Sequence, residues 1–121
     1  MSNKRTYDYA VEFFKIRAGQ KKEAFEELKK YDRTVQFKVP DEESFVMEVR
    51  GGQATFKKGE IETPDIEVEA DSQTFISIFR GEMTPAQAFL DGKLLAFRGW
   101  VDKTKPYFPW LTKIIRIVQG R

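Results

Sequence analysis

The chain has 121 residues, of which 14% are aromatic and 33% are charged, and its formal net charge is +2 at pH 7. It contains no histidine and no cysteine, which excludes disulfides, thiolate nucleophiles, cysteine-ligated metals and every catalytic triad that needs a histidine base. A chain of this length is typical of one domain, so we expect residues 1–121 to fold as one unit.

Two amphipathic helices are predicted at the start of the chain. In residues 7–18 the apolar side chains recur at helical spacing, and Gly19 is expected to end this helix. Residues 21–31 predict a second helix, whose apolar stripe contains Leu28 and whose wet side contains Glu27.

The hydrophobic period then changes to two, which is typical of strands with one wet face. Four strands are predicted, over residues 34–39, 45–50, 53–58 and 65–70. In the first of them the alternation places Gln36 on the wet face. Gly51 and Gly52 predict a two-residue hairpin turn, because both residues accept positive φ.

Two short capped helices follow the fourth strand. Asp71 or Ser72 is expected to cap a helix over residues 74–80. Thr84 begins a capping box for the second short helix, which ends at Gly92. A fifth strand over residues 93–100 and a last helix over residues 110–119 complete the chain. This order predicts an α+β fold, with a five-stranded, mostly antiparallel sheet and helices packed on one face.

The segment from Asp71 to Gly99 resembles the sterol carrier protein type-2 family. The family pattern is a capped short helix, a glycine, then Pro–x–x–Ala–Phe, then Gly–Lys–Leu at the entry to the last strand. Here it reads Asp71-Ser72, Phe75, Gly81-Glu82-Met83-Thr84-Pro85, Ala88-Phe89 and Gly92-Lys93-Leu94. With the strands upstream, the resemblance covers residues 33–100.

This resemblance implies that the sheet and the helices enclose an apolar tunnel. It implies non-covalent binding of a lipid, either a fatty acid, a fatty acyl-CoA or a sterol-like ligand, and its transfer between membranes. It also implies a protein without catalytic residues, metal or cofactor. If the core is filled instead, the same fold would serve as a non-catalytic interaction or oligomerisation module of a lipid-metabolism enzyme.

The last strand departs from the family pattern. The glycine that follows Gly–Lys–Leu comes one residue late, at Gly99, and Leu95 and Phe97 stand where polar residues are common. This departure predicts either a bulge in the strand or a second buried face.

Apolar residues of the two short helices, the fifth strand and the last helix are the candidates for the tunnel wall. They are Phe75, Phe79, Phe89, Leu90, Leu94, Ala96, Leu111, Ile114, Ile115 and Val118. Ordinary core packing would explain any single one of them as well.

Aromatic and basic residues alternate through the C-terminal run, which favours transient contact with an anionic membrane or a ligand entrance. They are Trp100, Lys103, Lys105, Tyr107, Phe108, Trp110, Lys113 and Arg116. The alternative is a solvated helix edge with buried tryptophans. Nucleic acid is disfavoured, because residues 59–92 carry a net charge of −7 beside this run.

The sequence also gives expectations for the location of the protein, its oligomeric state and metal binding. No run of about 20 apolar residues and no signal-peptide pattern occurs, so we expect a cytoplasmic protein. The sequence is compatible with a homodimer as well as with a monomer. Among the acidic residues of 60–71, Asp65, Glu67 and Glu69 alternate as on the wet face of a strand, and the segment lacks the spacing of a calcium loop, so no metal site is expected.

Overall fold

The computed structural model describes residues 4–98 and 106–120 of the chain. The strands are β1 (Arg33–Lys38), β2 (Phe45–Arg50), β3 (Gln53–Lys58), β4 (Ile66–Glu69) and β5 (Leu95–Arg98). The helical segments are α1 (Thr6–Ala10), η1 (Val11–Arg17), α2 (Ala18–Gln20), α3 (Lys22–Lys30), α4 (Ser72–Phe79), α5 (Pro85–Leu90) and α6 (Phe108–Gln119).

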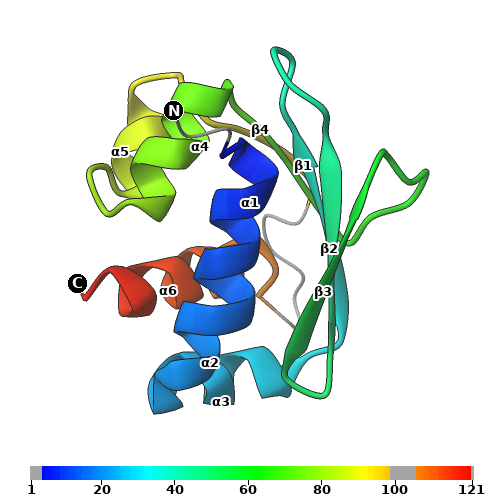
Figure 1. The fold of residues 1–121 in the computed structure, drawn as a ribbon, viewed down its shortest axis with the longest axis vertical. Coiled ribbons are helices and arrows are strands. Elements are labelled where there is room, and N and C mark those ends of the chain that lie inside the picture. The colour runs from blue at the N-terminus through cyan, green and yellow to red at the C-terminus, as the bar shows by residue number, and fades with distance from the viewer. Residues whose placement is uncertain (1–3, 99–105, 121) are drawn as a thin grey trace.

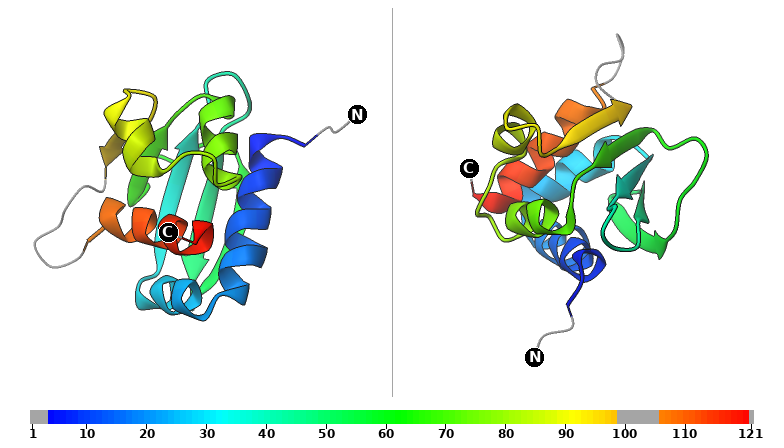
Figure 2. Two further views of the ribbon diagram at one scale, coloured as in Figure 1. Left: turned by 90° about the vertical axis from the view of Figure 1, so that its left-hand side faces the viewer. Right: turned by 90° about the horizontal axis from the view of Figure 1, so that it is seen from above.

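The strands form one sheet in the order β3-β2-β1-β4-β5, and the helices lie on one face of it (Figure 1). Strand β1 pairs in parallel with β4, and the other three pairs are antiparallel. The predicted α+β architecture is confirmed. In Figure 2, α1 and η1 lie toward the β3 edge and α5 lies at the β5 edge, with α6 between them.

The first helix continues through Gly19 to Gln20, so the prediction that Gly19 ends it is wrong. Gly19 does not adopt the positive φ with which a glycine ends a helix, and the helix ends where Lys21 becomes extended. Its middle, η1, is π-helical. The wider π turn lets the neighbouring residues Phe13 and Phe14 both face the core, where both are buried.

The prediction that Glu27 lies on the wet side of α3 is also wrong. Its side chain is buried, because α6 crosses α3 at this point. The indole Nε1 of Trp110 donates to the Glu27 carbonyl oxygen at 2.7 Å, and so joins the two helices. A sequence pattern within α3 alone contains no sign of a helix that is more than 80 residues away.

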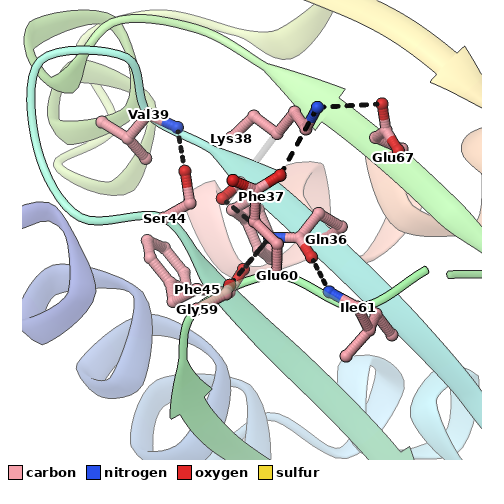
Figure 3. Close-up of polar contacts among 10 residues, drawn as sticks. All are labelled: Gln36, Phe37, Lys38, Val39, Ser44, Phe45, Gly59, Glu60, Ile61 and Glu67. Atoms are coloured by element: carbon pink, nitrogen blue, oxygen red, sulfur yellow. Dashed lines mark hydrogen bonds and ion pairs between the residues drawn. The ribbon is translucent and has the colours of Figure 1, made fainter.

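The connection from β3 to β4 crosses the outer face of the sheet and is held there by Gln36 (Figure 3). The Gln36 amide nitrogen donates to the carbonyl oxygens of Phe45 and Gly59, both at 3.1 Å. Its amide oxygen accepts from the backbone N–H of Ile61 at 2.9 Å. Gln36 is therefore buried, contrary to the alternation, because this connection covers it.

The predicted hairpin turn and the predicted N-caps at Asp71 and Thr84 are confirmed. Gly51 and Gly52 have φ of 58° and 85°, as the tight β2–β3 turn requires. The Asp71 carboxylate accepts from the backbone N–H of Thr74 at 2.8 Å and caps α4. The Thr84 hydroxyl accepts from the N–H of Gln87 at 3.1 Å and caps α5.

Strand β5 has the predicted bulge. Ala96 pairs with Val68 and Arg98 pairs with Glu67, so Phe97 is the additional residue. The alternative prediction, a second buried face, is wrong, because Leu95 and Phe97 are exposed on this edge strand.

Candidate functional site

An apolar pocket lies between the sheet and helices α4, α5 and α6, where the tunnel is expected. Its walls are formed by Phe37, Val68, Phe75, Ile78, Phe79, Pro85, Leu94, Phe108, Leu111, Thr112 and Ile115. The volume of this pocket, counted as the space that the centre of a water molecule can occupy, is about 10 Å³. This is room for about one water molecule, and no acyl chain fits it without movement of the walls.

One side of the pocket is aromatic. Phe75 and Phe79 are one helical turn apart on α4, and their rings stack with centroids 6.1 Å apart and planes 8° apart. The Phe37 ring on β1 meets both, at 5.6 Å from Phe75 and 6.3 Å from Phe79. The spacing of four residues on α4 thus directs both rings toward the sheet.

The rings of η1 support Phe79 from behind. Phe13 lies 5.3 Å and Phe14 5.8 Å from Phe79, measured between ring centroids. Phe14 also lies 6.0 Å from Phe37. Phe79 therefore has little space on the side away from the pocket, and its displacement would require η1 to shift as well.

The first turn of α6, which brings Phe108 to the pocket, is held by Arg33. The guanidinium of Arg33 is buried between two tyrosine rings, 4.0 Å from the centroid of Tyr31 and 4.1 Å from that of Tyr107. Its Nη1 donates to the carbonyl oxygen of Pro106. Through this hydrogen bond, Arg33 of β1 holds in place the segment that leads into α6.

The Glu27 carboxylate makes the second attachment of α6. The ammonium of Lys113 lies 2.7 Å from Glu27 Oε1, and the ammonium of Lys30 lies 2.9 Å from it. Burial raises the pKa of Glu27, but the hydrogen bonds and charges of Lys113 and Lys30 outweigh it, and the pKa lies below its usual value. Glu27 is therefore ionised at neutral pH and holds Lys113 of α6 in place.

The other end of α6 is tied to α4 and to the α4–α5 connection. The side-chain amide of Gln119 donates to the carbonyl oxygens of Ile78 at 2.8 Å and Met83 at 2.9 Å. Arg17 of η1 donates to the carbonyl oxygens of Phe79 on α4 at 3.0 Å and of Val118 on α6 at 3.4 Å, and so joins the two helices. These hydrogen bonds hold the pocket closed at this end.

The structure brings five of the ten predicted wall residues to the pocket. These are Phe75, Phe79, Leu94, Leu111 and Ile115. Ile114 and Val118 are buried in the surrounding core, and Ala96 is half-buried on β5. Phe89 and Leu90 are exposed on α5, outside the pocket of this structure.

Six wall residues were not among the candidates. They are Phe37, Val68, Ile78, Pro85, Phe108 and Thr112. The alternation of β1 and β4 shows that Phe37 and Val68 face the helices, but it does not show which inward residues meet the pocket. Ile78 lies on the buried face of α4, so helical spacing could have identified it.

The structure describes part of the predicted membrane or entrance surface, and in that part the aromatic residues are buried or half-buried, whereas the basic residues are exposed. Trp100, Lys103 and Lys105 lie outside the described residues. Phe108 and Trp110 are buried and Tyr107 is half-buried against Arg33. The aromatic members face inward on two different sides of α6, because Phe108 shares a face with the pocket residues Leu111 and Ile115, whereas Trp110 is directed toward α3, where it bonds Glu27. Lys113 and Arg116 are exposed.

A larger hollow of about 350 Å³ lies beside the start of α1, but it has the wrong chemistry for hydrocarbon. Its walls are Arg5, Tyr7, Asp8, Asp41, Glu42, Glu43 and Lys58. Within residues 4–98 and 106–120, no three acidic residues are grouped so as to hold a metal ion. Across the same residues, no helix has the length and hydropathy needed to cross a bilayer.

Comparison with known proteins identifies relatives of this fold. Residues 13–96 match the SCP-2 sterol transfer family. None of the curated proteins matches the chain by sequence. The solution structure of sterol carrier protein domain 2 of Helicoverpa armigera has a TM-score of 0.72 and 18% identity, over 97% of this chain and 91% of that one.

Two further structures show how widely this fold occurs. Palmitated SCP2L2 from Aedes aegypti has a TM-score of 0.58 and 17% identity, over 92% of both chains. The sec-alkylsulfatase Pisa1 from Pseudomonas sp. has a TM-score of 0.62 and 15% identity, over 75% of this chain. The present chain spans only 13% of that sulfatase. At these identities the likeness shows a common fold.

Proposed function

The chain belongs to the SCP-2 sterol transfer family, and on this premise we propose that it binds the acyl chain of a lipid non-covalently between the sheet and helices α4–α6. Family and fold support lipid binding in general. The observation that carries the specific proposal is the pocket itself, whose walls come from both layers of the fold and are almost entirely hydrocarbon.

Apolar burial is sufficient to drive such binding. Each CH₂ group that leaves water contributes about 0.8 kcal/mol, so a ten-carbon stretch contributes about 8 kcal/mol before costs. Ordering the ligand and moving the walls apart reduce this gain. None of the pocket walls formed by described residues is charged, so the charged head of a fatty acid or an acyl-CoA would stay at the surface.

Binding would require the pocket to open. The closed pocket of about 10 Å³ has to expand several-fold to take an acyl chain. The hydrogen bonds of Gln119 to the carbonyl oxygens of Ile78 and Met83, and of Arg17 Nη2 to that of Val118 at 3.4 Å, are polar contacts that such an opening would break or stretch. The proposal therefore includes an outward movement of α6 relative to α4.

The small volume also favours a second candidate function. A core that is nearly filled suits a non-catalytic interaction or oligomerisation module, and the likeness to part of a long sulfatase chain is compatible with that role. We expect no catalytic activity in either case. A cytoplasmic location and contact of Lys113 and Arg116 with anionic lipid stay predictions.

Native mass spectrometry of protein purified without detergent tests the carrier proposal. We expect a co-purifying adduct of a few hundred daltons, and displacement of a bound fluorescent fatty acid by palmitate. Ile115→Trp should fill the pocket and abolish displacement, whereas Leu28→Met, a buried change on α3, should retain it. No adduct together with no displacement would refute the carrier and favour the module.

A further inference from the structure

Large apolar side chains are exposed mainly at one edge of the molecule. In the described part of the chain five such residues are exposed, and four of them lie within nine consecutive residues. Phe89 is 37%, Leu90 83%, Leu95 45% and Phe97 54% exposed, and the fifth is Ile16. We call these four residues of α5 and β5 the α5–β5 edge.

The α5–β5 edge is the outside of a wall whose inside lines the pocket. Pro85 of α5 and Leu94, which immediately precedes β5, both face the pocket. The ring of Phe89 lies 6.4 Å from that of Phe108, another wall residue. In Figure 2, α5 and β5 lie side by side at the β5 edge of the sheet. A lipid that crossed this wall would pass directly from the edge into the pocket.

The size of the edge favours a lipid surface over a protein partner. With about 200 Å² for a fully exposed side chain of this size, the four residues expose roughly 400 Å². A stable protein interface buries about 800 Å² on each partner, or twice this area. Insertion into the headgroup region of a bilayer has no such minimum area, because its strength scales with the apolar area that is buried.

The charges at the edge favour an uncharged surface. Asp91 and Lys93, both exposed, lie between α5 and β5 and carry opposite charges. In the sheet, Glu69 pairs with Leu95 and Glu67 lies opposite the bulge at Phe97, so carboxylates also flank the edge, and these residues provide no attraction to anionic headgroups. Its contact with a bilayer would depend on apolar side chains and change little with salt.

We propose that the α5–β5 edge inserts Leu90, Leu95 and Phe97 into the surface of a lipid bilayer, and that this contact is where the protein exchanges its ligand. The inference rests on the proposed lipid binding and adds the surface and its partner. It differs from the basic and aromatic C-terminal run, since it depends on neither its lysines nor its tryptophans.

Co-sedimentation with small vesicles of phosphatidylcholine tests the proposal. Because membrane affinity scales with buried apolar area, the double variant Leu90→Ser/Phe97→Ser should bind vesicles at least about tenfold more weakly than the unaltered protein. Leu90→Ser alone should show a smaller loss. The matched control is Ile16→Ser, an exposed apolar residue on η1, which packs beside β3 at the other side of the molecule. It should bind vesicles normally.

A second measurement separates this proposal from the proposed function. Displacement of a fluorescent fatty acid in solution should be unchanged in Leu90→Ser/Phe97→Ser, because neither residue lines the pocket. Normal vesicle binding by the double variant, or an equal loss in Ile16→Ser, would overturn the membrane contact while lipid binding stands. If the protein is dimeric and the double variant monomeric, the edge is a protein interface and the proposal is wrong. Vesicle binding without fatty-acid binding would refute the proposed function instead.

Discussion

Two adjacent isoleucines on α6 offer a matched test of the pocket. Ile114 and Ile115 are both buried, but only Ile115 is a pocket wall. Changing either one to alanine removes three carbons, which costs about 2.4 kcal/mol of transfer free energy at 0.8 kcal/mol each. Each 50 Å³ of cavity that remains adds about 1.2 kcal/mol. We therefore expect each variant to lose roughly 2.5–4 kcal/mol of unfolding free energy.

The affinity for ligand should distinguish the two variants, although their unfolding free energies without ligand are similar. At a hundred times its Kd, a ligand stabilises the native state by about 2.7 kcal/mol. Ile115→Ala enlarges the space in which the chain is expected to lie and so reduces the opening that binding requires. We expect palmitate to bind Ile115→Ala about fivefold more tightly than the unaltered protein, or about 1 kcal/mol. Ile114→Ala should bind palmitate with normal affinity.

Urea unfolding with and without palmitate measures both quantities on the same samples. The expected result is a larger palmitate-induced rise in unfolding free energy for Ile115→Ala than for Ile114→Ala. If palmitate stabilises the two variants equally, the position of Ile115 in the pocket has no relation to binding, and the reasoning from the pocket walls is refuted.

Three further predictions concern the contacts that hold the helices. The lowered pKa of Glu27 means that its ion pair with Lys113 stabilises the fold at neutral pH and that this contribution is lost as pH falls through the lowered pKa. Glu27→Gln should therefore show a smaller loss of unfolding free energy between pH 7 and pH 3, and equal losses would contradict this. Asp71→Ala should cost about 1 kcal/mol in urea unfolding, with most of it restored in Asp71→Ser; no loss would mean that the cap is energetically silent. Arg33→Lys removes the planar group between Tyr31 and Tyr107 and should cost about 2 kcal/mol, which calorimetry would show as a lowered Tm. An unchanged Tm would exclude a role for this stack.

Features that depend on neighbouring residues could be predicted from the sequence. The caps at Asp71 and Thr84 are local hydrogen bonds within three residues, and the turn at Gly51 and Gly52 needs only two positive φ values. The bulge in β5 followed from one additional residue, Phe97, in a known pattern. In each case the physical cause lies within a few residues of its effect.

Features that depend on distant segments could not be predicted in this way. Glu27 and Gln36 are polar residues on expected wet faces, and each is buried by a segment elsewhere in the chain. The inward orientation of the Trp110 side chain likewise depends on the contact between α6 and α3. The pocket walls are a further case, since apolar spacing shows that Phe37 is buried but not that it meets Phe75 and Phe79.

The location of a bound acyl chain is the most direct test of the proposed function. Methyl NMR spectra of the protein titrated with palmitate would report on leucine, isoleucine and valine side chains throughout the core. We predict shifts at Leu94, Leu111 and Ile115, with Leu28 on α3 and Val49 on β2 unchanged. Shifts at Leu28 and Val49 without shifts at the pocket, or no shifts at all, would contradict lipid binding between the sheet and α4–α6.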